Sequence, residues 1–250
     1  MTDPLQLLLL VGVGILAGFL NVMAGGGSTI TLPLLIFMGM DSTLANGTNR
    51  VAILMQNISA VTSFRRQEHS RFRQSMLFAL FTIPGAIAGA FFAARISDEL
   101  FQRILAIVMI GVIISLFVTP SGRREESQEQ TGFRALLIYP AMFAIGFYGG
   151  FIQVGVGFIF MAALYHLLKL SLAFVNMHKV FIVLVYTIPA LLVFAWGGHV
   201  AWVPGILLGA GNAVGGWWAA RAAVRKGDKL IRAVLVVAIF VMAVKLLGVF

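Results

Sequence analysis

Ten apolar runs divide this chain of 250 residues, and they restrict its fold more than any other feature. Eight of them are long enough to cross a bilayer, because the hydrocarbon core needs about 20 residues of helix. Lipid offers no hydrogen bonds to the backbone, so a crossing segment must satisfy its own backbone groups, as a helix does. The sequence therefore predicts an all-α integral membrane protein, with helices at residues 5–24, 28–40, 44–64, 74–94, 100–118, 134–154, 157–168, 172–196, 201–220 and 229–250.

The composition agrees with a lipid-embedded chain. Hydrophobic residues make up 60% of it and charged residues 11%, against roughly 25% charged residues in soluble domains. The 18 Lys and Arg outnumber the 9 Asp and Glu. In a soluble protein this excess suggests nucleic acid, but the cytoplasmic loops of membrane proteins collect basic residues, so no nucleic-acid partner is expected. Without cysteine there is no disulfide and no thiolate metal site, and no metal or cofactor is predicted.

Loop charges predict the orientation of the chain. Basic residues gather in three segments that are expected in the cytoplasm: 65–73, 123–134 and 221–229. Other loops are poor in Lys and Arg and are expected outside: those around 41, at 98–99 and at 197–199. This assignment leaves both termini outside.

Two parts of the sequence resemble each other. Residues 14–21 match residues 146–153, with glycine on glycine and amide on amide. Further matches follow in the same order: 44–51 with 172–180, given a one-residue slip, and 85–95 with 211–221. Small residues recur at such spacings in many membrane helices for packing alone. The ordered series of matches favours a duplication instead.

Equivalent loops of the two copies carry opposite charge. Loop 65–73 is basic, whereas its counterpart at 197–200 has no Lys or Arg. The next loop, 95–99, is charge-balanced, whereas 221–229 is basic. Equivalent loops are therefore expected on opposite membrane faces, an architecture typical of secondary transporters. The sequence predicts two inverted repeats, each a helical hairpin with a broken or half-helix plus three transmembrane helices: a first repeat at 1–118, a cytoplasmic linker at 119–133 and a second repeat at 134–250.

The two short apolar runs each follow a glycine-rich break, Gly25-Gly26-Gly27-Ser28 in the first copy and Gly155-Val156-Gly157 in the second. A helix that begins inside the membrane exposes backbone N–H groups, which together with the helix dipole form an anion site. Ser28 is expected to cap the first of these helices with its hydroxyl. Alternatively, the glycines only form tight hairpin turns. Whether the short segments cross fully or are re-entrant is left open.

Two basic residues, Arg50 and Lys179, lie within the predicted spans at equivalent places. A cation in a membrane segment is costly and by default functional. Each is predicted either to neutralise a bound anion or to extend toward the membrane surface. All nine acids fall in or beside predicted loops, so the spans offer no carboxylate for protons or sodium, and an anionic substrate is favoured.

The candidate substrate-binding residues lie at the breaks or on the helices that follow them: Asn21, Gly25, Gly26, Gly27, Ser28, Asn46, Thr48, Asn49, Arg50, Gln153, Gly155, Gly157, Asn176, His178 and Lys179. Three further amides, Gln56, Asn57 and Asn212, either line a cavity or form interhelical hydrogen bonds. No catalytic or metal-binding residue is predicted.

Several motifs of the first copy resemble the sulfite exporter TauE/SafE family of anion transporters: Gly18 through Asn21, Gly25-Gly26-Gly27-Ser28, Leu32-Pro33, and Ala45 with Thr48-Asn49-Arg50. The resemblance covers essentially the whole chain. It implies a transporter that moves sulfite, sulfoacetate, thiosulfate or another organosulfonate across the bacterial cytoplasmic membrane. The partners would be a small anion and the lipid bilayer, and a homo-oligomer is left open. The second copy departs from the family pattern at Gly155-Val156-Gly157 and Asn176-Met177-His178-Lys179, which leaves the identity of the anion open.

Two other functions compete with transport. An intramembrane serine hydrolase would use Ser28 and His178, but the segment is not a Gly-x-Ser-x-Gly elbow and no acid is available to orient the histidine. A purely structural membrane protein would not need two polar breaks in lipid. The chain is therefore predicted not to be an enzyme.

Overall fold

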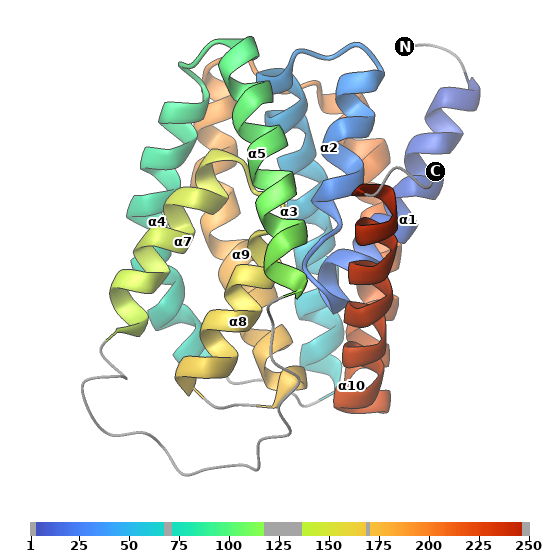
Figure 1. Ribbon diagram of the computed structural model, residues 1–250, viewed down its shortest axis with the longest axis vertical. Coiled ribbons are helices and arrows are strands. Elements are labelled where there is room, and N and C mark those ends of the chain that lie inside the picture. The colour runs from blue at the N-terminus through green and yellow to red at the C-terminus, as the bar shows by residue number, and fades with distance from the viewer. Residues whose placement is uncertain (1–3, 68–71, 118–136, 169–170, 247–250) are drawn as a thin grey trace.

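The computed structural model describes residues 4–67, 72–117, 137–168 and 171–246, and its described elements are all helices (Figure 1). In chain order they are α1 (Pro4–Met23), α2 (Ser28–Phe37), α3 (Ser42–Arg66), α4 (Phe72–Ala93), α5 (Asp98–Phe117), α7 (Ile138–Phe151), α8 (Val156–Leu168), α9 (Leu172–Trp196) and α10 (Trp202–Leu246). The all-α prediction is confirmed for these residues. The predicted linker at 119–133 lies outside them.

Three of the described helices are long and apolar enough to cross a membrane, namely those containing Gln6–Met23, Arg73–Ala93 and Leu172–Trp196. Three others are apolar but shorter: Ser28–Phe37, Ile138–Phe151 and Val156–His166. The segment predicted as a full crossing at 134–154 thus contains a described helix of only 14 residues. The helix before the first break, α1, is longer and has 20 residues.

The last two predicted spans, 201–220 and 229–250, are described as one helical element of 45 residues, α10. The prediction of a basic loop at 221–229 is therefore wrong, and Asp228 lies in a helix. The segment from Ala219 onward is rich in alanine, arginine and lysine and has no proline. Alanine, arginine and lysine have high helix propensity, so their charges alone do not end a helix, although Gly227 and Asp228 in the same segment are weak helix formers.

Two helix pairs pack through glycines whose neighbours leave no room for a side chain. In the pair α1 and α10, a Cβ atom on Gly14 would lie 2.6 Å from the carbonyl oxygen of Leu208. In the pair α4 and α7, a Cβ atom on Gly85 would meet the Phe143 carbonyl and one on Gly146 the Thr82 carbonyl. The same applies along both seams at Gly18, Gly211, Gly215, Gly89 and Gly150. Each pair joins a helix from the first half of the sequence to a helix from the second half.

The centre of the molecule is formed by α3 and α9, whose residues 45–53 and 175–183 are all buried. The beginning of α3 lies beside the end of α9: the Arg50 guanidinium is 4.7 Å from the ring centre of Phe194. The two central helices therefore run in opposite directions, as Figure 1 also shows. On its outer side, α3 packs against α10, and α9 packs against α4.

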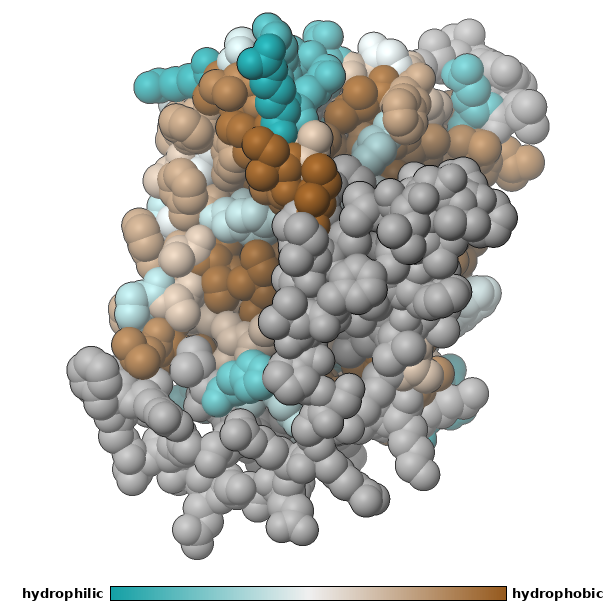
Figure 2. Space-filling model, viewed as in Figure 1, coloured by the Kyte–Doolittle hydropathy of each residue, from teal (hydrophilic) through white to brown (hydrophobic). Residues whose placement is uncertain are grey.

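The surface separates into a polar end and an apolar flank. Figure 2 shows hydrophilic side chains gathered at one end of the molecule and hydrophobic ones on the flank below. Large apolar side chains are exposed on the flanks of several helices, among them Leu16, Leu80, Leu192 and Trp218. Exposure of these side chains to water would be unfavourable, whereas contact with the hydrocarbon core of a bilayer is favourable.

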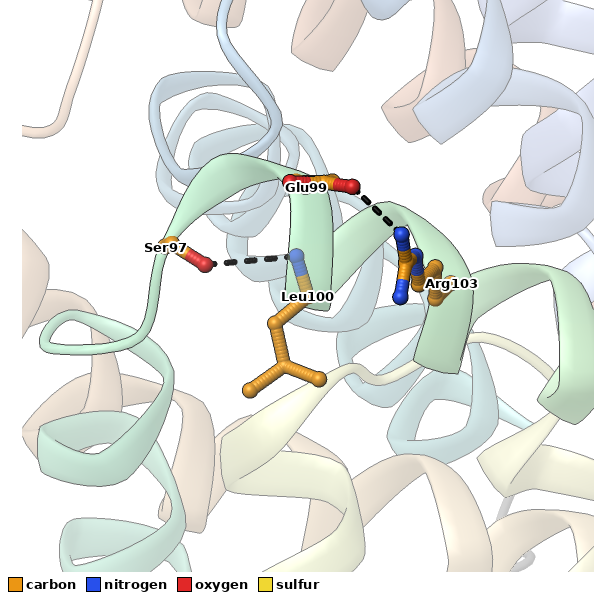
Figure 3. Close-up of polar contacts among 4 residues, drawn as sticks. All are labelled: Ser97, Glu99, Leu100 and Arg103. Carbon is orange, nitrogen blue, oxygen red and sulfur yellow. Dashed lines mark hydrogen bonds and ion pairs between the residues drawn. The ribbon is translucent and has the colours of Figure 1, made fainter.

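The start of α5 shows how an exposed helix end is organised (Figure 3). The Ser97 hydroxyl accepts a hydrogen bond from the Leu100 backbone N–H at 3.4 Å, as an N-cap residue does. Glu99 and Arg103 are one helical turn apart on α5 and form an ion pair, with 2.5 Å between the Arg103 Nη2 and Glu99 Oε1 atoms. Asp98 accepts a hydrogen bond from the backbone N–H of Ser42 at 2.6 Å and so holds the first turn of α3 to α5.

Candidate anion-binding site

Both predicted breaks are present, and they meet. The first separates α1 from α2, and the second separates α7 from α8. Gly25 has φ +91° and Gly155 has φ +70°, the left-handed region that glycine adopts without strain. Gln153 also has a positive φ, of 60°, which is unusual for a residue with a side chain. Gly25 and Gly157 lie in contact, because a Cβ atom on Gly25 would be 2.5 Å from the Gly157 Cα.

Ser28 does not cap α2, contrary to the prediction. The N-cap residue is Gly27, which forms no side-chain cap hydrogen bond, and Ser28 is the first residue of the helix itself. A hydroxyl caps a helix from the N-cap position, which precedes the first helical residue, and Ser28 lies one residue C-terminal to that position. Its hydroxyl instead accepts a hydrogen bond from the Asn49 amide at 3.4 Å.

Arg50 is fully buried and binds the end of α7. Its guanidinium donates to the backbone carbonyls of Gly149, at 3.1 Å, and of Gly150. It also donates to the side-chain oxygens of Gln153, at 3.2 Å, and Asn46, at 3.5 Å. A cation at a helix C-terminus is stabilised by the helix dipole. Arg50 therefore does not extend toward the membrane surface.

Lys179 occupies the corresponding position on α9 and binds the end of α1. Its ammonium donates to the carbonyls of Asn21, at 3.2 Å, and Val22, at 2.7 Å, and to the Asn176 side-chain oxygen at 2.7 Å. Lys179 as a whole residue is 2% exposed, so it too does not reach the membrane surface. Arg50, from the first half of the sequence, thus caps α7 of the second half, and Lys179, from the second half, caps α1 of the first.

A small cavity lies where the breaks cross. It admits about 10 Å³ of water-sized space, which corresponds to about one water molecule. Its polar lining consists of one ammonium, four amides and one hydroxyl, with no carboxylate. The lining residues are Asn21, Ser28, Gln56, Asn57, Gln153, Val156, Gly157, Lys179, Val180 and Val183.

Five candidate residues from the sequence come together in this lining: Asn21, Ser28, Gln153, Gly157 and Lys179. Two of the amides are oriented by hydrogen bonds to residues in the same half of the sequence. Asn21 donates to Gln56 at 3.1 Å, and Gln153 donates to the Thr187 hydroxyl at 3.4 Å.

The other candidates lie around the cavity and do not line it. Asn46 donates to the Phe151 carbonyl at 2.8 Å, and Thr48 accepts from the Ala201 backbone N–H at 2.9 Å. Asn49 and Asn176 have partners nearby: Asn49 accepts from Thr31 at 2.7 Å, and Asn176 donates to the Met23 carbonyl at 3.4 Å. Also outside the lining are Gly25, Gly26, Gly27, Arg50 and Gly155.

His178 points away from the cavity and toward α4. Its Nδ1 lies 2.7 Å from the Ser75 hydroxyl, and its ring packs edge-on against Phe78 with 6.0 Å between ring centres. Ser28 and His178 therefore face different helices, which removes the geometric basis for a serine hydrolase.

Three lining residues were missed from the sequence: Val156, Val180 and Val183. Valine is the ordinary residue of a membrane helix, so its identity carried no signal. The spacing of two of these valines does carry a signal. Val180 and Val183 follow Lys179 by one and four positions, so they lie on the same side of α9 as Lys179. Gln56 and Asn57, for which two roles were left open, both line the cavity.

The comparison with protein families gives one match. The model described as "Sulfite exporter TauE/SafE" matches residues 10–246, which contain all of the cavity lining. The chain belongs to the sulfite exporter TauE/SafE family. The resemblance seen in its first-copy motifs is thereby confirmed.

Bacterial relatives of this TauE/SafE chain are named as probable membrane transporters. "Probable membrane transporter protein YfcA" of Escherichia coli (strain K12) is 31% identical over 248 residues, which is 99% of this chain and 91% of the relative. "Probable membrane transporter protein ORF9" of Sinorhizobium sp is 30% identical over 234 residues, covering 93% and 89%. A "Probable membrane transporter protein" of Haemophilus influenzae is 28% identical over 242 residues, covering 96% and 94%. No solved structure matches the chain. The chain is a membrane transporter of the TauE/SafE type and not an enzyme.

Proposed function

We propose that this TauE/SafE protein moves a small sulfur-containing anion, such as sulfite, sulfoacetate, thiosulfate or another organosulfonate, across the bacterial cytoplasmic membrane. The observation that carries the proposal is the buried ammonium of Lys179 in a cavity lined by amides and a hydroxyl, without a carboxylate. Such donors suit an oxyanion, because hydrogen bonds to a charged group are about twice as strong as neutral ones.

The anion would bind where the two breaks cross. Ser28 is the first residue of α2 and Gly157 is in the first turn of α8, so both short helices begin at the cavity. Helix N-termini offer backbone N–H groups and a partial positive charge to an anion. The cavity as described holds about one water molecule, so binding requires the lining to open. Such a change is the expected behaviour of an alternating-access transporter.

The inverted repeat also belongs to this proposal. It is supported by the opposite directions of α3 and α9 and by the two matching glycine seams. It is further supported by the reciprocal caps, in which Arg50 binds the end of α7 and Lys179 binds the end of α1. In an inverted-repeat transporter the substrate site lies near the membrane midplane between the copies.

Flux into liposomes tests the proposed function. The purified protein is reconstituted, and uptake of radiolabelled sulfite, thiosulfate and sulfoacetate is compared with uptake of a cationic solute of similar size. Flux of at least one of these anions, absent from protein-free liposomes, is expected. Equal permeability to the cation, or no flux of any of the anions, would contradict the proposal.

A further inference from the structure

Six of the described helices form two groups that do not follow the two halves of the sequence. The first group contains α1, α3 and α10, and the second contains α4, α7 and α9 (Figure 1). Each has three members, and each takes a helix from the other half of the chain. We call them the α1 group and the α7 group.

Within each group the contacts are close and involve backbone or short side chains. In the α1 group, besides the seam between α1 and α10, Ser59 and Ser63 of α3 donate to the carbonyls of Ala213, at 2.7 Å, and Trp217, at 3.2 Å. In the α7 group, α4 packs on α7 through its own seam. There the Ser75 hydroxyl of α4 lies 2.7 Å from the His178 ring of α9.

The contacts between the groups are different in kind. They include the packing of α3 and α10 against α9, the crossing of the breaks at Gly25 and Gly157, and the buried cations. Two amides, Asn46 and Asn176, also donate to carbonyls across the boundary, those of Phe151 and Met23. Arg50 reaches from the α1 group to Gly149, Gly150 and Gln153, and Lys179 reaches from the α7 group to Asn21 and Val22. The cavity lies on this boundary, because its lining comes from both sides.

Resting on the proposed transport function, we propose that the α1 group and the α7 group, and not the two halves of the sequence, are the bodies that move in transport, and that Arg50 and Lys179 are the positioning residues that join them. The glycine seams fix α10 to α1 and α4 to α7, because backbones in contact leave no gap to deform. The boundary also has a backbone contact, at Gly25 and Gly157, but around it lie a cavity and side-chain hydrogen bonds whose partners can be exchanged.

The two links are not equivalent. Arg50 does not line the cavity, whereas Lys179 does. An anion that enters the cavity therefore competes with the Asn21 and Val22 carbonyls for the ammonium, and it weakens the Lys179 link while the Arg50 link persists. A ligand shifts a conformational equilibrium only through such a difference in affinity between the states.

Disulfide cross-links test the assignment, and the absence of native cysteine makes each pair unique. Val51→Cys with Gly205→Cys joins α3 to α10, where the Cβ atoms would be 3.1 Å apart. Phe81→Cys with Tyr139→Cys joins α4 to α7, whose rings lie 4.6 Å apart, through a short bifunctional thiol reagent. Met23→Cys with Asn176→Cys joins α1 to α9 across the boundary, where the native residues are hydrogen-bonded.

All three pairs connect the first half of the sequence to the second, but only the third connects the two groups. We expect anion flux in the cross-linked state to match the reduced state for the first two pairs. For the third, flux is expected to fall to that of protein-free liposomes and to return on reduction. Loss of flux in both of the first pairs, or its persistence in the third, would overturn the proposal.

Spin-label distances give a readout that needs no flux and so separates this proposal from the transport function. Labels at Leu16 and Trp218 lie in one group, whereas labels at Leu16 and Leu80 lie in different groups, and all three side chains are exposed. The Leu16–Trp218 distance is expected to stay constant when sulfite is added and when Lys179 is replaced by Gln. The Leu16–Leu80 distance is expected to shift in the Lys179→Gln variant. A shifting Leu16–Trp218 distance, or a fixed Leu16–Leu80 distance under both conditions, would overturn the group assignment even in a protein that moves no anion.

Discussion

Gly25 and Gly157 touch backbone to backbone at the point where the two broken hairpins cross, with only 2.5 Å between the Gly157 Cα and the place where a Gly25 Cβ would be. They come from breaks 132 positions apart in the chain. Because α2 and α8 both begin next to this contact, their positions at the cavity depend on each other.

Gly157→Ala is expected to separate the breaks and reduce transport. A methyl group at this position would collide with the Gly25 backbone, and overpacking of this kind costs about 1–3 kcal/mol. Thermal unfolding and liposome flux measure the two effects. Gly12→Ala in α1 is the matched control, because a Cβ atom there meets nothing within 4 Å. Equal unfolding temperatures for the two variants would show that the contact is not tight.

Lys179→Gln is expected to weaken anion binding without preventing folding. A hydrogen bond to a charged group contributes about 1.5–3 kcal/mol, so the dissociation constant should rise about tenfold to a hundredfold. Calorimetric titration of the purified variant with a transported anion measures this. Unchanged affinity in a folded variant would remove Lys179 from the site and leave the backbone donors.

Arg50→Gln is expected to act mainly on stability, because Arg50 does not line the cavity and satisfies the carbonyls of Gly149 and Gly150. Each buried polar group left without a partner costs about 1–3 kcal/mol. Thermal unfolding should therefore occur at a lower temperature than for the unsubstituted protein. If Arg50→Gln instead left stability intact and lowered anion affinity, Arg50 would be a direct ligand, as the sequence alone allowed.

His178→Gln tests proton coupling. If His178 carries a proton with the substrate, the pH dependence of flux should disappear in this variant, because histidine titrates near neutral pH. The control is Ser75→Ala, which removes the hydroxyl 2.7 Å from Nδ1 but keeps the imidazole, and which should keep a pH dependence. Parent-like pH dependence in a transporting His178→Gln protein would exclude the coupling role.

Cysteine labelling tests the inverted topology. Single cysteines at Ser70 and Gly198 are expected to react with an impermeant thiol reagent from opposite sides of the membrane, because their loops have opposite charge character. Ser70 lies outside the described residues, and Gly198 is exposed in the turn between α9 and α10. Labelling of both from the same side would rule out the inverted repeat.

Sequence patterns predicted the helical segments, both breaks and five of the lining residues, because apolar length, glycine and membrane amides each have a direct structural meaning. They did not predict which helices pair. The glycines Gly14 and Gly18 on α1 indicate that another helix backbone approaches closely. They do not indicate which helix, because its contacting residues, Leu208 and Asn212, lie almost 200 positions away in the sequence. The same limit applied to the cations: a buried Arg50 needs acceptors, and these turned out to be carbonyls 99 and 100 positions further along.

Two errors have a local cause. The basic charges at 221–229 were given more weight than the helix propensity of the residues that carry them, so α10 was divided. At the first break, Ser28 was predicted to cap α2 because its hydroxyl can accept a hydrogen bond, but Gly27 occupies the N-cap position. A shift of one residue, which sequence patterns rarely resolve, changed the role of the side chain.

The glycine seams also affect how the protein is made. When the ribosome has completed the first 118 residues, α1 and α4 are already synthesised, but α10 and α7, against which their glycines pack, are not. During this interval their bare backbone faces have only lipid or the insertion machinery to contact. The nascent chain therefore reaches its final packing late, and truncation before α10 should leave α1 without its partner and expose the product to membrane proteases.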